Sequence, residues 1–240
     1  MKKNVKVILF AFLLVAGVLL QVQLYRMRPF KRPDISGSVV AFIGGFRSLA
    51  AEIVWFRADR LQEEGRYVEL SQLASTLTFL EPHTPEVWSF AAWNLAYNIS
   101  VMMPTYEDRW RWVEAGLKLL RDDAIRMNPE EAELYRELAW MFQIKLGGDI
   151  DSASALYRRK WKEKVESVAG DWSKLAMSRR EMEDVEKATS FSDWTDPRLS
   201  AVYWAKKGLP FAQGNTKKFL VEIIRQSLYA MRNDKAKFSL

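Results

Sequence analysis

The chain has 240 residues, contains no cysteine and carries a formal net charge of +6. The absence of cysteine excludes disulfides, thiolate nucleophiles and cysteine-ligated zinc. Residues 1–36 hold seven basic side chains against one acid and so account for the whole net charge, while the other 204 residues carry 29 basic and 29 acidic side chains. Because a nucleic-acid-binding domain needs a basic field on its own surface, we expect no nucleic-acid partner.

The first element expected along the chain is a membrane-spanning helix. An unbroken apolar run extends from Val7 to Leu20 and, continued to Leu24, reaches about the length that crosses a bilayer. Three lysines precede the run, as in a signal sequence, but no small residues are well placed for cleavage. Residues 1–28 are therefore predicted to be an uncleaved signal anchor in the cytoplasmic (inner) membrane. Basic residues flank both ends, and the short basic tail favours the bulk of the chain lying outside the cytoplasm.

Residues 29–47 are expected to form a juxtamembrane linker. Their apolar part, 39–46, contains Gly44 and Gly45, follows Pro29 and Pro33, and is too short to span a membrane. We expect this part to be a helix that lies on the membrane surface or caps the first repeat.

One helical phrase then occurs three times, at 52–61, 86–95 and 133–142. Each copy begins with a glutamate and carries an alanine at the same place, followed by a large apolar residue. The alanines are Ala58, Ala92 and Ala139, and the large residues are Leu61, Leu95 and Phe142. Repetition of helical phrases is typical of a solenoid, in which each unit buries its apolar face against the next. The fold class expected is therefore all-α.

Each phrase is expected to open an antiparallel helix pair within a repeat region at 48–165. The first pair should run from 48 to 64, reverse at Gly65-Arg66 and return over 67–80, because proline and glycine then end the helical pattern. The second should begin at Pro85 and close at Asn128-Pro129, and the third should begin at Glu130 and turn at 147–149. Residues 166–196 are predicted to be a charged helical connector, and 197–240 a degenerate helix pair.

These details resemble the tetratricopeptide repeat family, in which a bulky residue early in the first helix is followed by a small residue, an aromatic residue or leucine, and a proline near the end. The best copy comprises Tyr135, Leu138, Ala139, Phe142, Gly148, Ala153 and Tyr157. The second repeat matches at Trp88, Ala92, Leu95 and Pro129, and a weaker copy at Trp204, Gly208, Phe211 and Leu220. The copies depart from the family in spacing: the first two start 34 residues apart, but the next interval is 47. The resemblance implies an α-solenoid that mediates protein–protein interaction.

In such arrays the first helices line a concave groove that receives a peptide or a partner helix. The resemblance implies that the groove is lined by Trp55, Asp59 and Gln62 from the first repeat, Trp93 and Tyr97 from the second, and Arg136, Trp140 and Gln143 from the third. Trp93 and Trp140 hold equivalent places and should lie side by side. Either they bind a partner, or they are packed under an insertion at 101–109. Trp88 and Tyr135 are expected in the core.

Catalytic residues are scarce. His83 is the only histidine and lies in a proline-flanked turn. Histidine-based catalysis therefore has only this one possible base, and a histidine-rich metal site is excluded. We expect no enzyme activity, no metal and no small-molecule cofactor. Glu52, Glu86 and Glu133 are expected near helix N-termini, where carboxylates favour the helix dipole. Asn94 and Asn98 could hold a peptide backbone, or they could be solvated or pack between repeats.

The function expected is that of a membrane-anchored scaffold that binds a protein partner in the bacterial envelope, in assembly or secretion. The alternative is a permanent structural subunit of a membrane complex with no exchanging ligand. An enzyme acting on envelope polymers would need a pair of carboxylates in a cleft, which the sequence does not show.

Overall fold

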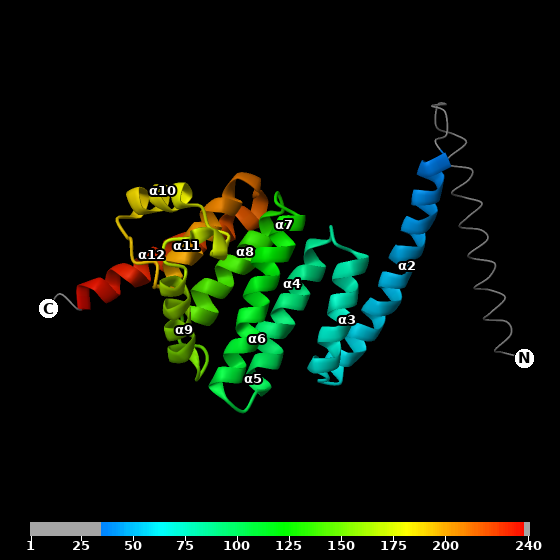
Figure 1. Cartoon of the computed structure of the whole chain (residues 1–240), viewed down its shortest axis with the longest axis horizontal. Helices are drawn as coiled ribbons and strands as arrows, with labels where there is room; N and C mark the ends of the chain where they lie inside the picture. The colour runs from blue at the N-terminus through cyan, green and yellow to red at the C-terminus, as the bar shows by residue number, and fades with distance from the viewer. Residues whose placement is uncertain (1–34, 238–240) are drawn as a thin grey trace, which may run out of the picture. The chain divides into compact units, whose positions relative to one another are not determined.

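The structure, a computed structural model, describes residues 35–237, with side-chain burial from Leu49 onward. Every regular element of these residues is helical, as the sequence predicts (Figure 1). None of these helices is both long enough and apolar enough to cross a bilayer. The predicted anchor at 1–28 lies outside the described residues. The chain divides into two compact units, residues 1–46 and 47–240, and the repeated phrases all lie in the second.

The first helix pair consists of α2 (Ile35–Glu63) and α3 (Tyr67–Leu80). The expected start of the first helix, Ser48, is wrong, because α2 already begins at Ile35. No proline interrupts 35–63, and the three glycines of this segment lower helix propensity without ending the helix. Glu52 consequently lies inside α2, not near its N-terminus. The chain reverses at Gly65, whose φ of +70° suits glycine, as the sequence predicts. A separate apolar cluster joins α2, α3 and the next helix through Ala51, Ala58, Leu61, Leu70, Leu77 and Val87.

Each of the next three helices changes from α-helical to π-helical winding without a break in the chain's helical path. α4 (Pro85–Trp93) passes through a π-helical segment, Asn94–Ile99, into α5 (Ser100–Met102). α6 (Tyr106–Lys118) passes through Leu119–Ala124 into α7 (Ile125–Met127), and α8 (Ala132–Trp140) continues through Met141–Leu146. α9 spans Ser154–Ser167.

The π-helical segments after α4 and α8 occupy equivalent places in their repeats. One begins directly after Trp93 and the other directly after Trp140. A π-helical turn adds a residue to the turn and is common at functional sites. Its recurrence at matching positions supports the correspondence of the second and third phrases, and the apolar spacing alone did not predict it.

The C-terminal part adds a second layer against α8. A short 3-10 turn, Trp172–Leu175, precedes α10 (Arg179–Thr189), α11 (Pro197–Gly208) and α12 (Gly214–Lys237), with a 3-10 turn at Leu209–Phe211. The segment expected as a charged connector contributes Leu175, Met182 and Trp194 to the main core. α11 lies directly against α8, since a Cβ added to Gly208 would come 2.5 Å from the Cβ of Tyr135.

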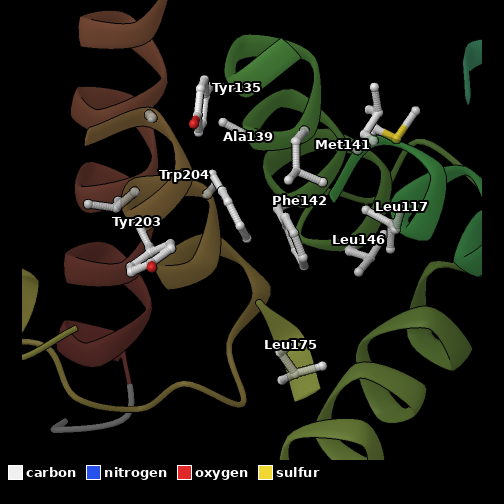
Figure 2. Close-up of a cluster of buried hydrophobic side chains, with 14 of the residues drawn as sticks. Leu117, Tyr135, Ala139, Met141, Phe142, Leu146, Leu175, Tyr203 and Trp204 are labelled. Atoms are coloured by element: carbon white, nitrogen blue, oxygen red, sulfur yellow. The ribbon is translucent and has the colours of Figure 1, made fainter. Parts of the chain in front are cut away.

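Tyr135, Phe142, Tyr203 and Trp204 lie with aliphatic side chains such as Leu117, Leu146 and Leu175 in one buried cluster (Figure 2). The rings of Phe142 and Trp161 meet edge to face with centroids 4.7 Å apart, and Trp204 is only 1% exposed. Trp88 and Tyr135 are buried, as predicted, at 7% and 3% exposure. The repeated alanines Ala58, Ala92 and Ala139 are fully buried, which is consistent with their fixed place in the phrase.

Candidate partner-binding surface

Trp93 and Tyr97 form an aromatic stack at the junction of the second and third phrases. Their ring centroids lie 4.2 Å apart at an interplanar angle of 21°. Trp93 is 42% exposed, although the preceding Ala92 is fully buried. The indole Nε1 donates a hydrogen bond of 3.2 Å to Oε2 of Glu137 on α8. The stack is therefore held in place from one side and open to solvent on the other.

Charged groups surround the base of this stack. Arg136 donates to Oε1 of Glu137 at 2.5 Å and to Oε2 of Glu133 at 2.6 Å. Burial raises the pKa of Glu137 above its ordinary value, and Arg136 and the Trp93 indole only partly oppose the shift. Burial, followed by the nearby Glu137 carboxylate, also raises the pKa of Tyr97. Trp93 thus lies beside the Arg136–Glu137 ion pair and is oriented by its hydrogen bond to Glu137, while Tyr97 packs under the indole.

Trp140 lies half-buried against the core, one helical turn after Glu137. Because Trp93 bonds Glu137, Trp93 reaches the turn of α8 that carries Trp140. Within residues 35–237 no ring contact joins the two indoles. The two tryptophans therefore lie on neighbouring helical turns, but their rings do not touch as expected. The exposure of Trp93 shows that the 101–109 segment does not cover it.

Helix α12 covers part of the face that was expected to be open at the third repeat. Gln143 is 7% exposed, and its Nε2 donates to the backbone oxygen of Ile223 at 3.2 Å. The Arg136 guanidinium lies 5.8 Å from the ring centroid of Phe219, and the Thr216 hydroxyl donates to Glu133. Gln143 is consequently covered by α12 and is not presented to a ligand, although its buried Oε1 accepts no hydrogen bond from the described residues. Arg136 remains half-exposed.

The first repeat places its predicted groove residues differently. The Trp55 ring is half-buried, with its centroid 5.1 Å from that of Phe90, which precedes Trp93 by nearly one turn of α4. Asp59 and Gln62 are exposed on α2. No hydrogen bond among the described residues connects Asp59 or Gln62 to the Trp93 stack, so these two side chains form at most an outlying part of the surface.

Asn94 packs between repeats, and Asn98 bonds to it. Asn94 is 1% exposed and its Nδ2 donates to the backbone oxygen of Tyr67 at 3.1 Å. Asn98 donates to Oδ1 of Asn94 at 3.3 Å. Inter-repeat packing is therefore correct for Asn94, whose amide holds the second helix pair against the first, whereas the hydrogen bond of Asn98 lies within its own helix.

Two hollows lie among the described helices, and the smaller one is lined by Glu114 and four basic side chains, Lys118, Arg121, Lys164 and Lys174. One of about 210 Å³ lies between α3, α4 and α6, and one of about 60 Å³ lies between α6 and α9. Both are smaller than the usual cofactor pocket of about 300–1,000 Å³. His83 places Nδ1 3.4 Å from Oδ1 of Asn128, joining two inter-helix turns. Across the described part of the chain no group of three His, Asp or Glu residues is arranged to hold a metal ion.

Glu137 is the residue of this surface that the sequence reasoning missed. Glu137 is an acid inside an apolar phrase, one turn before Trp140, and this unusual position could have indicated its role from the sequence. Comparison of the chain with protein-family models, with curated proteins and with solved structures finds no match. A function for this chain is therefore inferred from the surface formed by Trp93, Tyr97 and Arg136.

Proposed function

We propose that the chain is a membrane-anchored scaffold of the tetratricopeptide-repeat type that holds a protein partner outside the cytoplasm of a bacterium, in envelope assembly or secretion. The observation that carries this proposal is the exposed Trp93 indole, which is hydrogen-bonded to Glu137 and stacked on the half-buried Tyr97 ring. Rigid tryptophan and tyrosine side chains next to arginine are the residue types that contribute most to binding at protein interfaces.

The partner-binding surface proposed here is smaller than the groove expected from the sequence. It centres on Trp93, Tyr97 and the half-exposed Arg136, with Trp140 behind them. Because α12 already lies along the rest of α8, the partner would contact the stack and the adjoining end of α4. An apolar or aromatic side chain of the partner would pack on the open face of the indole.

Co-purification from the native membrane tests this function. Trp93→Ala should lose a partner that the wild-type chain retains, whereas Val221→Ala should keep it, because Val221 is similarly exposed at 50% but lies on α12. Truncating an interface tryptophan of this kind costs about 2–4 kcal/mol of affinity. Equal retention by both variants would contradict the proposed surface.

A permanent structural subunit is the second candidate. It is favoured by exposed apolar side chains on other helices, such as Phe56 of α2 at 77% and Tyr229 of α12 at 67%. A scaffold releases its partner on dilution and rebinds it, whereas a structural subunit stays bound until it denatures. Partner dissociation after dilution of the purified complex distinguishes the two.

A further inference from the structure

Helix α2 has two apolar faces, and only one of them is packed. Ala51, Ala58 and Leu61 are at most 5% exposed and face α3 and α4. Leu49, Ile53 and Phe56 are 36%, 66% and 77% exposed. With 3.6 residues per turn, the second set lies on the side of the helix opposite the first. A surface helix normally carries one apolar stripe, so the second stripe indicates another contact.

The spacing of the exposed stripe identifies the kind of contact. Leu49, Ile53 and Phe56 are separated by four and then three residues. A spacing of four and then three is that of successive seam positions where one helix packs along another. The stripe therefore fits a second helix better than a flat surface.

The charges beside the stripe select the partner and its direction. With Ile53 and Phe56 in the seam, Glu52 and Arg57 occupy the two flanking positions that pair between chains in a parallel coiled coil. They are five residues apart and of opposite charge, so each would face its counterpart in an identical chain. In an antiparallel pair Glu52 would instead approach Asp59, another acid. Glu52 and Arg57 make no salt bridge with other described residues.

We propose that α2 is a homodimerisation helix that pairs in parallel with α2 of a second copy of this chain. The pair buries Leu49, Ile53 and Phe56 of both copies and sets Glu52 of each against Arg57 of the other. The interface is isologous, with the same patch on both copies, as in most dimers with two-fold symmetry. This contact is separate from the Trp93 surface, so either proposal can fail without the other.

Single-cysteine cross-linking tests the parallel register. The natural chain has no cysteine, so Leu49→Cys introduces a single thiol into the full-length protein. In a parallel, in-register pair the two Cβ atoms at this position come close enough for a disulfide. Mild oxidation should give a covalent dimer with Leu49→Cys but not with Val68→Cys, a control that is 47% exposed on α3. Equal cross-linking of the two variants, or no cross-linking of either, overturns the proposal. The exposed stripe would then be expected to contact the bilayer or residues 7–24.

Charge reversal tests the pairing of Glu52 with Arg57. In sedimentation of the full chain in detergent, Glu52→Arg should raise the dimer dissociation constant by about threefold or more, because it weakens two symmetric pairs. Adding Arg57→Glu should restore the wild-type value. A double variant as weak as the single one contradicts the parallel arrangement, and a wild-type chain that is monomeric contradicts the dimer itself.

Discussion

At the scale of single residues, Asp151 and Glu137 have side chains that are only 4% and 10% exposed, yet their pKa values shift in opposite directions. Burial raises the pKa of both. For Asp151, hydrogen bonds from Lys145 Nζ at 2.7 Å and from the Ala153 amide at 2.9 Å outweigh burial and lower the pKa. For Glu137 the bonds from Arg136 and Trp93 are weaker than the effect of burial, and the pKa is raised.

The Lys145–Asp151 pair is expected to be essential for the fold. Asp151→Asn leaves the 2% exposed Lys145 ammonium without its anion and should destabilise the protein by about 3–5 kcal/mol. Lys145→Met should cost less, since Asp151 keeps bonds from Tyr157 and Ala153. Urea unfolding at pH 7 measures the stability of both variants. Equal stability of the two would show that an unpaired Lys145 charge does not cause the loss in Asp151→Asn.

The pH dependence of the two carboxylates should differ in sign. The lowered pKa of Asp151 contributes stability above its unfolded pKa of about 3.9, and this is lost as pH falls through the folded value. The raised pKa of Glu137 destabilises the folded protein as pH rises above the ordinary pKa of a glutamate, because the unfolded chain then loses the proton before the folded one does. Glu137→Gln should therefore melt no earlier than wild type at pH 7, and should lose this advantage near pH 4. Thermal melts at the two pH values check the prediction, and a Glu137→Gln variant that melts clearly earlier at pH 7 contradicts it.

At the scale of elements, the sequence predicted the helices better than their packing partners. The reversal at Gly65, the start at Pro85 and the end of α7 before Asn128 follow from local signals, namely glycine at positive φ and proline at a helix start. The course of α12 along α8 depends on long-range contacts, which no local pattern encodes. Gln143 was therefore expected to face a groove, although its amide bonds the carbonyl of Ile223.

The contact of α11 with α8 depends on a residue without a side chain. Gly208→Ala would place a Cβ 2.5 Å from that of Tyr135, so the two helices must separate. We expect a loss of about 1–3 kcal/mol in the free energy of unfolding. Lys206→Ala, on the same helix and half-exposed, should change stability by no more than about 0.5 kcal/mol. Denaturant titration of both variants is the measurement, and a Gly208→Ala variant as stable as Lys206→Ala would contradict the close approach.

At the scale of the whole molecule, the all-α class was predictable because the phrase recurs with a helical period, and the structure confirms it for residues 35–237. The membrane anchor stays a prediction, since residues 1–28 lie outside the described part. The Trp93 stack was predictable in its residues, because Trp93 follows the repeated alanine. Its link to Glu137 was not, because that bond joins residues 44 positions apart.

Membrane topology is a prediction about the whole chain. A reporter that is active only outside the cytoplasm should be active when fused after residue 240 and inactive when fused at residue 3. This follows from the apolar run at 7–24 with its short basic tail. Activity at residue 3 alone would place the helical unit in the cytoplasm and remove the extracytoplasmic part of the proposed function.

Photo-cross-linking in living cells tests the central claim, that the Trp93 stack is where a partner binds. A photoreactive residue placed at position 93 of the full chain should give one discrete adduct with another protein. The same residue at position 229 on α12, which is also exposed at 67%, should not give that adduct. An adduct that forms equally from both positions, or from position 229 alone, would contradict a partner-binding surface at Trp93.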